Sequence, residues 1–480
     1  MKRLILSLAG LLVLLTSAQA ALIYVDRDDD LIINGDGGCD LRDAINSANF
    51  NLAFDDCNAG DDDLLDLVLI DVDGPIQLSN GIAVFGSTLI GRNGLGPRPL
   101  IIAAPNSRHF EVYNEDPDDE FLIANLHLKG GFEATENGGS ILINSGDRVS
   151  IVGTIFEDNQ ALSGGAIYAT GALVDDFEIL RNEFINNTAT GDVDDVGSGG
   201  AFSGTNSVTG VMLIEDNVFR DNMAGIGGAM YISDGGDDIT LRRNQFIANE
   251  STGSGGALYF SAREGGQDFN MPNNVLMFNT AANNGGAMFS FASNNSTIEI
   301  TNSTLAFNEA DIGGAISTNG SNYQIRASTL IHNRANDGSQ VNRLFNTGLM
   351  VFYKSIIANN GQQTDNCTGG VLGGLGDNID SDGSCGFDPL DNNQVADPML
   401  SGIKTYDNGF PGFEPTVNSP ALDVEDDAFC YVPPGIDLTE DQNGNPRSLD
   451  GDDDGTASCD TGAIEAPANT DLIYADQFGL

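Results

Sequence analysis

The chain has 480 residues, no tryptophan, and 70 acidic side chains against 20 basic ones, giving a formal net charge of −50. Such a surface repels nucleic acid, anionic lipid and polyanionic sugars such as pectate, and excludes them as partners unless calcium reverses the charge locally. We interpret the charge mainly as a source of solubility and of scattered cation binding outside the cell.

Residues 1–20 are typical of a secretory signal. Lys2 and Arg3 precede an apolar run of about 12 residues, and residues 18–20 (Ala-Gln-Ala) form a cleavage site. A membrane span needs about 20 apolar residues, so the run is too short to be an anchor. We expect an exported chain that begins at Ala21, has no transmembrane segment, and is secreted or held at the cell surface, where association with an outer membrane is left open.

Residues 21–75 differ in composition from the rest of the chain. Within residues 39–49, Leu41, Ile45 and Ala48 share one helical face, which predicts a helix. The segment resembles the domain named for its Cys-Ser-Leu-Arg-Glu-Ala motif (CSLREA), with aspartate at the second and fifth positions of the motif. That family places the segment at the amino end of secreted β-helix proteins. We interpret it as a short helical cap that covers strand edges and core at the open first rung.

Residues 76–365 contain a repeat of the form Phe-x-x-Asn-x-Ala followed by Gly-Gly-Ala. Successive copies lie 25 to 35 residues apart. Periods of this size indicate a solenoid, whereas a β-propeller blade needs about 40 to 50 residues. The clear copies begin at Phe156, Phe184, Phe219 and Phe246, and the weaker ones at Leu276, Leu305, Leu330 and Ile357.

Stacking the copies produces columns of like residues. Apolar columns stand five and seven residues before the Phe position with mostly polar residues between them, which is the alternation of a strand. Asparagine and Gly-Gly suit the corners between three short strands, which predicts an all-β, right-handed parallel β-helix of the pectin-lyase-like type. Three residues after the Phe position, asparagines are expected to form a structural ladder along the axis: Asn159, Asn187, Asn222, Asn249, Asn279, Asn308, Asn333 and Asn360.

These phrases resemble the Gly-Gly-Ala-Ile and Phe-x-x-Asn repeats of the polymorphic outer membrane protein family, over roughly residues 138–360. The resemblance implies a β-helix from the passenger region of a surface protein. It implies nothing about activity, because the matching residues are all structural.

The repeat fades after residue 365. Residues 366–465 are rich in Gly, Asp and Pro, and their closing phrases at 441–447 and 459–465 resemble those of secreted β-helix proteins grouped as choice-of-anchor domains. We interpret this region as a loop-rich carboxy-terminal cap. Residues 466–480 are a carboxy-terminal tail, in which residues 472–478 resemble a short tail found on such exported proteins. The purpose of the tail does not follow from the sequence.

All six cysteines lie outside the regular repeats. An even number in an exported chain predicts disulfides, although six cysteines allow fifteen pairings. Pairing of neighbours is the simplest hypothesis, with Cys39 to Cys57 and Cys367 to Cys385. The disulfide candidates are Cys39, Cys57, Cys367, Cys385, Cys430 and Cys459.

Calcium is a candidate ligand of one acidic loop. Asp450, Asp452 and Asp454 precede a glycine in the Asp-x-Asp-x-Asp-Gly order that begins a calcium loop, but Thr461 stands where a bidentate Glu is expected. The alternative is a solvated acidic loop. Residues 378–383 repeat the beginning of the motif less completely.

A catalytic role has one set of candidates. Arg181, Asp216 and Arg243 stand in one column of consecutive repeats and form the only mixed-charge cluster that we predict on the strands. A lyase would use such an arginine as base, whereas the alternative that we favour is an ion ladder between strands.

The prediction for function is therefore a scaffold for adhesion, ligand binding or surface structure, with an extracellular glycan or a host or cell-surface ligand as partner. The alternative is a polysaccharide-active enzyme, a lyase or glycoside hydrolase, that uses the outer face of the β-helix. The absence of tryptophan disfavours a sugar cleft, because such clefts stack sugar rings on aromatic side chains, although tyrosine can substitute.

Overall fold

The computed structural model describes residues 20–467 with short gaps. The gaps are residues 31–36, 62–63, 114–118, 147, 171–173, 192–195, 206–207, 234–237, 263–267, 293–295, 345–347, 360–363, 371, 425–429, 433–435 and 453. The predicted signal of residues 1–20 and the tail of residues 466–480 therefore lie almost wholly outside the described residues.

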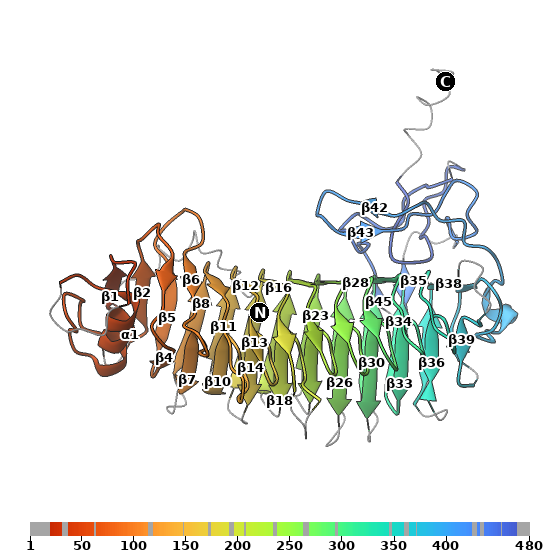
Figure 1. Ribbon diagram of the computed structural model, residues 1–480. Coiled ribbons are helices and arrows are strands. Elements are labelled where there is room, and N and C mark those ends of the chain that lie inside the picture. Colours follow the sequence, from red (N-terminus) through yellow and green to blue (C-terminus); the bar gives the residue numbers. More distant parts are fainter. Residues whose placement is uncertain are drawn as a thin grey trace, which may run out of the picture.

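The described chain is a parallel β-solenoid, as predicted, with long sheets running along its axis (Figure 1). Three sheets, named A, B and C here, have 13, 12 and 11 described strands. Sheet A consists of β1 (Leu22–Val25), β2 (Asp66–Ile70), β5 (Thr88–Arg92), β8 (Glu120–Ala124), β11 (Arg148–Val152), β15 (Val174–Leu180), β19 (Val208–Glu215), β23 (Asp238–Arg242), β27 (Asp268–Pro272), β31 (Thr297–Thr301), β34 (Asn322–Arg326), β37 (Met350–Tyr353) and β40 (Gly373–Gly374).

Sheets B and C follow sheet A within each rung. Sheet B consists of β3 (Ile76–Gln77), β6 (Leu100–Ile102), β9 (His127–Lys129), β12 (Ile155–Glu157), β16 (Glu183–Ile185), β20 (Val218–Arg220), β24 (Gln245–Ile247), β28 (Val275–Met277), β32 (Thr304–Ala306), β35 (Thr329–Ile331), β38 (Ile356–Ala358) and β41 (Ile379–Asp380). Sheet C consists of β4 (Ile82–Val84), β7 (Phe110–Tyr113), β10 (Ile141–Ser145), β14 (Ile167–Thr170), β18 (Phe202–Thr205), β22 (Met230–Ser233), β26 (Leu258–Ala262), β30 (Met288–Ala292), β33 (Ile316–Asn319), β36 (Val341–Arg343) and β39 (Cys367–Thr368).

The central rungs add a short strand between sheets B and C. These strands form sheet D, which consists of β13 (Gln160–Ala161), β17 (Thr188–Ala189), β21 (Met223–Ala224), β25 (Glu250–Ser251) and β29 (Thr280–Ala281). The Gly-Gly corner into sheet C leaves no room for a side chain. A Cβ built on Gly228 would lie 2.2 Å from the carbonyl oxygen of Gly256, because neighbouring rungs approach each other there through their main chains.

The predicted columns are the core. Phe184 pairs with Phe219, and Phe219 with Phe246, on adjacent strands of sheet B. Their rings stack with centroids 4.7 Å apart at interplanar angles of 2° and 5°, and all three side chains are fully buried. In sheet A the buried Ile214 pairs with Ile179 and Leu241 of the neighbouring rungs. The alternating strand pattern therefore places one residue of every two in a continuous dry core.

The asparagines of the ladder column link the rungs. Asn222 Oδ1 accepts hydrogen bonds from the main-chain N–H and the Nδ2 of Asn187, at 3.0 and 2.9 Å, and Asn222 Nδ2 donates to Phe184 O at 3.0 Å. The same bonds connect neighbouring column members from Asn159 to Asn333. Asn360 lies outside the described residues.

One helix lies at the amino-terminal end of the solenoid (Figure 1). Helix α1 (Leu41–Phe50) is capped by Asp40, whose side chain accepts a hydrogen bond from the Asp43 N–H. Its Leu41 and Ile45 are fully buried, and Asn49 Nδ2 donates to the carbonyl oxygen of Ala83 in β4. The predicted boundary at residue 75 does not separate two structural units, because β1 and β2 are the first two strands of sheet A.

The carboxy-terminal region differs from the predicted cap. The solenoid continues past residue 365 to β41, followed by the short helix η3 (Pro389–Asp391). Residues after it then turn back and lie along the flank of the last rungs, instead of covering their end (Figure 1). This region contains the hairpins β42 (Lys404–Thr405) with β43 (Pro411–Gly412) and β44 (Tyr431–Val432) with β45 (Ile436–Asp437).

Outward apolar residues of sheet B explain this position. Val275, Met277 and Ile331 point away from the core, yet they are buried against Phe410 and Phe413 of the carboxy-terminal region. Burial of this apolar surface favours a region that lies on the side of the solenoid.

Hydrogen bonds attach the segments 441–447 and 459–465 to the same flank of the solenoid. Arg447 Nη2 donates to Asn302 Oδ1 at 2.8 Å, and its guanidinium forms a buried ion pair with Glu465 at 3.5 Å. The Ala463 N–H donates to Thr329 Oγ1 at 3.0 Å. The two phrases therefore attach the region to rungs of the solenoid.

Three disulfides are present, as expected. They join Cys39 to Cys57, Cys367 to Cys385, and Cys430 to Cys459. The described residues contain no helix long and apolar enough to span a membrane.

Candidate functional site

The three candidate catalytic residues stand at corners and not on strands. Arg181, Asp216 and Arg243 each follow a strand of sheet A and have φ values of 56°, 58° and 53°. The left-handed conformation turns the chain from sheet A into sheet B within one residue, and it costs a non-glycine residue about 1 to 3 kcal/mol. The main chain at these positions is therefore held by the stack of rungs.

Two of these three residues are joined. Arg243 Nε lies 2.7 Å from Asp216 Oδ1, and Arg243 Nη2 lies 2.9 Å from Asp216 Oδ2. Arg243 also contacts Glu215, which binds Arg242 at 2.7 Å. The hydrogen bonds with Asp216 raise the pKa of Arg243, so this guanidinium is a poor base. Among the described residues, no ion pair joins Arg181 to Asp216.

Opposite charges also meet on other rungs, so the expectation of a single mixed-charge cluster is wrong. Lys129 of β9 contacts Glu157 at 2.9 Å and Asp158 at 3.2 Å on the next rung. His127 contacts Glu157 at 2.8 Å. Ion pairs between neighbouring rungs therefore occur at more than one place on the solenoid.

We expect Asp216→Asn to lower the free energy of unfolding by about 1 kcal/mol or less, because the pair with Arg243 is only half-buried. Asparagine also tolerates the left-handed corner, so the main chain is preserved. Thermal unfolding measures the effect. Asp221→Asn is the control, since Asp221 has the same φ of 58° and pairs with Arg220 of its own rung. Cleavage of any glycan that vanished in Asp216→Asn would contradict this structural role.

The acidic loop brings together a different set of carboxylates from the one predicted. Asp423, Asp450 and Asp452 have carboxylate oxygens within 4.8 Å of one another. Asp454 contributes its main-chain N–H, which donates to Asp450 Oδ1 and Asp452 Oδ1. Asp423 was missed in the sequence because it lies 27 residues before Asp450 and reaches the loop through the fold. Burial raises the pKa of the Asp423 carboxyl.

Calcium binding at this loop remains a prediction. We expect several millimolar calcium to add about 1 to 3 kcal/mol to the free energy of unfolding relative to EDTA, because extracellular sites bind with millimolar to submillimolar dissociation constants. Thermal melts in calcium and in magnesium at equal ionic strength measure the effect. Asp423→Asn is expected to remove it, whereas Asp454→Asn retains it. Identical melts in the two cations would contradict the prediction.

The second, less complete calcium motif is used for structure. Asn378 Oδ1 accepts a hydrogen bond from the Ser355 N–H, and Asn378 Nδ2 donates to Asn393 Oδ1. Asp380 accepts hydrogen bonds from the Cys385 N–H and Asn366 Nδ2, and burial raises its pKa to about 6. These side chains close the last rungs.

An aromatic row runs along the outer face of sheet C. Tyr168, Ser203, Tyr231, Tyr259 and Phe289 occupy one register position on five consecutive strands. The ring centroids of Tyr231 and Tyr259 lie 5.5 Å apart, and those of Tyr259 and Phe289 lie 5.1 Å apart. Their planes are tilted by 38° and 53°. Tyr231 and Tyr259 are partly exposed, whereas Phe289 is buried.

Hydroxyl groups flank this row. Two residues further along the strands, Thr205, Ser233 and Ser261 share the next outward register position. The Tyr168 hydroxyl lies 3.1 Å from Thr205 Oγ1. Thr205 is partly exposed, whereas Ser233 and Ser261 are buried, so the face presents the rings of three tyrosines beside the Thr205 hydroxyl.

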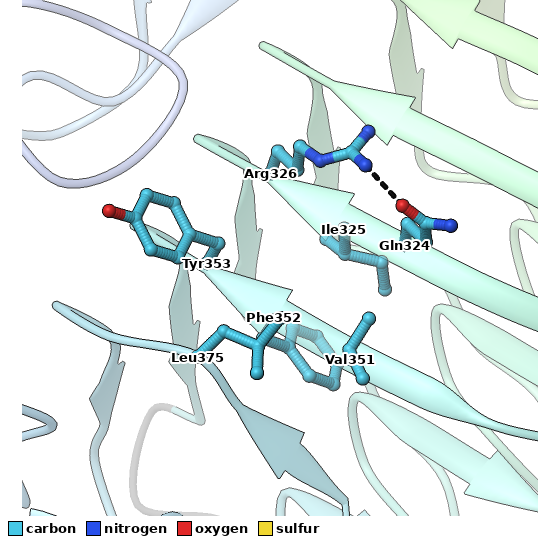
Figure 2. A pocket seen from close by; sticks show the side chains of 7 residues that line it. All are labelled: Gln324, Ile325, Arg326, Val351, Phe352, Tyr353 and Leu375. Carbon is cyan, nitrogen blue, oxygen red and sulfur yellow. Dashed lines mark hydrogen bonds between the residues drawn. The ribbon is translucent and has the colours of Figure 1, made fainter. Parts of the chain in front are cut away.

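A shallow hollow of about 240 Å³ lies on the outer face of sheet A near its carboxy-terminal end. Figure 2 shows Val351 and Tyr353 of β37 beside Leu375, with Arg326 hydrogen-bonded to Gln324 on β34. The hollow exists because the next strand, β40, consists of two glycines. The guanidinium of Arg326 is already bound to Glu299 and Gln324. The hollow therefore offers an apolar floor and no free reacting group.

Comparison with known proteins finds a match for one copy of the repeat. A family profile of the Chlamydia polymorphic membrane protein repeat matches residues 153–170. The matched segment contains Phe156, Asn159 and the Gly-Gly-Ala-Ile phrase at 164–167. No curated protein and no solved structure matches the chain significantly.

The conspicuous residues of the matched segment have structural positions. Asn159 and Gly164 lie at corners, and Phe156 lies in the core. The aromatic row was missed in the sequence although a signal existed, because each member directly follows the inward residue after Gly-Gly-Ala.

Proposed function

We propose that this protein is an exported, surface-displayed β-solenoid that holds an extended, neutral glycan along the outer face of sheet C. The single observation that supports the proposal is the row of partly exposed tyrosines on sheet C, with the Thr205 hydroxyl beside Tyr168. The tyrosines are Tyr168, Tyr231 and Tyr259. The repeat and the solenoid fit a surface-displayed β-helix protein. Three disulfides fit an oxidising compartment outside the cytoplasm.

The geometry suits a linear polymer. Sugar rings present apolar faces that stack on aromatic side chains, and their hydroxyls need hydrogen-bonding partners beside those rings. Tyr231 and Tyr259 lie on adjacent rungs with ring centroids 5.5 Å apart, so an extended polymer that follows the axis contacts both rings. A formal charge of −50 disfavours a polyanionic polymer, so the proposed ligand is neutral.

In this proposal the protein binds the glycan and does not cleave it. Asp216 and Arg243 neutralise each other at a corner between sheets A and B, whereas the aromatic row is on sheet C. A bound chain on sheet C therefore lies on another face from the pair that a lyase mechanism would use.

We expect Tyr259→Ala to weaken binding of a neutral glycan about two- to tenfold, because one aromatic stacking contact contributes about 0.5 to 1.5 kcal/mol. Titration of immobilised neutral β-linked glycans with the purified chain measures the affinity, and product analysis of the same mixtures measures cleavage. Tyr353→Ala is the matched control, since Tyr353 is an outward tyrosine on sheet A.

Two outcomes would contradict the proposed function. One is that the unaltered chain binds no neutral glycan. The other is equal loss of binding in Tyr259→Ala and Tyr353→Ala, which would place the ligand elsewhere.

A further inference from the structure

A polar hollow of about 260 Å³ lies in the carboxy-terminal region, apart from the sites described above. It forms where the turn of the hairpin β42–β43 meets the loop of residues 441–445. In Figure 1 this hairpin lies above the solenoid, whereas the labelled strands of sheet C run along the lower side of the solenoid. The residues that line the hollow are Thr405, Tyr406, Asp407, Asn408, Asn443 and Asn445.

Asp441 holds one side of the hollow in place. Its fully buried carboxylate accepts hydrogen bonds from the main-chain N–H groups of Asn443 and Asn445, at 2.8 and 2.9 Å, and from Asn445 Nδ2 at 3.1 Å. Asn273 Nδ2, at a corner of the solenoid, donates to the Asp441 carbonyl oxygen at 3.3 Å. The two asparagines are therefore positioned before a ligand arrives, which lowers the entropic cost of binding.

The hairpin forms the other side of the hollow. Asn408 Nδ2 donates to the Asn443 carbonyl oxygen and to Asn443 Oδ1, both at 3.2 Å, so the two sides are joined directly. The Tyr406 hydroxyl donates to Glu414 Oε2 at 3.3 Å, which orients the Tyr406 ring. The hollow is thus assembled from segments that lie 35 residues apart in the sequence, and only the fold brings them together.

Several polar groups of the hollow have no partner in the part of the chain that the structure describes. The Asp407 carboxylate and the Thr405 hydroxyl belong to exposed side chains that form no hydrogen bond to a described residue. Asn443 Nδ2 is buried and also has no hydrogen-bond partner there. A buried donor without a partner is rare in proteins and costs free energy until a ligand or water satisfies it.

These groups discriminate between classes of ligand. A divalent cation needs several oxygen ligands, with carboxylates among them, and Asp407 is the single carboxylate among the lining residues. An ammonium group only donates hydrogen bonds, so it leaves Asn443 Nδ2 without an acceptor. A sugar hydroxyl both donates and accepts, so it suits a carboxylate, a hydroxyl and amide groups together. The volume is below the about 300 to 1,000 Å³ of pockets for drug-sized ligands, which suits one sugar ring.

We propose that this hollow binds one neutral sugar unit through hydrogen bonds to its hydroxyl groups. Asp407 accepts hydrogen bonds from the sugar hydroxyls, and the amides of the loop complete the contacts. The formal charge of −50 and the Asp407 carboxylate disfavour an acidic sugar. The site does not depend on the function proposed for sheet C, because none of its lining residues belongs to that sheet.

Ligand-observed NMR on the chain from Ala21 to Leu480 tests the proposal, with methyl glycosides of glucose, galactose, mannose and N-acetylglucosamine as probes. At least one glycoside is expected to bind, in EDTA as well as in calcium, because no cation takes part. Asp407→Asn is expected to weaken this binding about tenfold or more, since hydrogen bonds to a charged acceptor are the strong ones. Thr405→Val, which removes a hydroxyl with little change in shape, is expected to weaken it about two- to tenfold.

Asp437→Asn is the matched control, since Asp437 is an exposed aspartate of the other hairpin and does not line the hollow. Tyr259→Ala is expected to bind the glycosides normally, which separates this site from sheet C. Asp407→Asn and Thr405→Val are expected to melt at the temperature of the unaltered chain, because neither side chain has a hydrogen-bond partner to lose. The proposal is overturned if no glycoside binds, if binding requires calcium, or if Asp407→Asn binds as tightly as Asp437→Asn.

Discussion

Ile214→Asp is expected to lower the free energy of unfolding by about 5 kcal/mol or more. Ile214 is fully buried between Ile179 and Leu241 of the neighbouring rungs. The substitution removes a packed aliphatic side chain, at a cost of about 2 to 5 kcal/mol, and places a carboxyl group in a site with no polar partner. The loss is a large part of the 5 to 15 kcal/mol by which domains are usually stable.

Circular dichroism during heating measures this effect as a large decrease in the melting temperature of the β-signal. Rungs contact only their neighbours, so unfolding is expected to begin at the mutated rung and spread along the axis. Leu213→Asp is the matched control, because Leu213 is the adjacent residue of β19 and points outward. An unchanged melting curve for Ile214→Asp, or equal effects of both substitutions, would show that the inward register is wrong.

Asn222→Ala is expected to lower the free energy of unfolding by about 3 kcal/mol. The Asn222 side chain is fully buried and accepts two hydrogen bonds from Asn187, while its Nδ2 donates to Phe184 O. Alanine leaves the Asn187 N–H and the Phe184 carbonyl without these partners, and each buried unsatisfied group costs about 1 to 3 kcal/mol.

Thermal or denaturant unfolding measures this loss, and Asn283→Ala is the control. Asn283 stands at an exposed corner of the solenoid, where its side chain makes no hydrogen bond to a described residue. A stability of Asn222→Ala equal to that of Asn283→Ala would mean that the ladder contributes nothing. Recovery of stability in Asn222→Ser would instead indicate that a shorter hydrogen-bonding group suffices, as it does in the serines that replace asparagine at Ser303 and Ser328 of the neighbouring column.

The sequence alone determined the solenoid, because in a stacked fold each residue contacts its equivalent one repeat later. Aligning the copies on Phe219 therefore placed Phe184 and Phe246 as its neighbours, and it predicted the contacts of Asn222 in the same way. Helix α1 was predictable for another reason, since the apolar face of a helix is a local pattern.

The tertiary structure decided what the repeat does not encode. The carboxy-terminal region lies on the flank because Val275, Met277 and Ile331 expose apolar surface outward, and the change from polar to apolar residues beside the Phe column was a signal of it. The left-handed corners turned Arg181, Asp216 and Arg243 away from the strand positions assumed for them. Asp423 joins the acidic loop only through the folded path of the carboxy-terminal region. Tyr231 and Tyr259 become neighbours only when the rungs are in register. Contacts between equivalent positions follow from a periodic sequence, whereas contacts between the solenoid and non-repeating segments depend on the folded path of the chain.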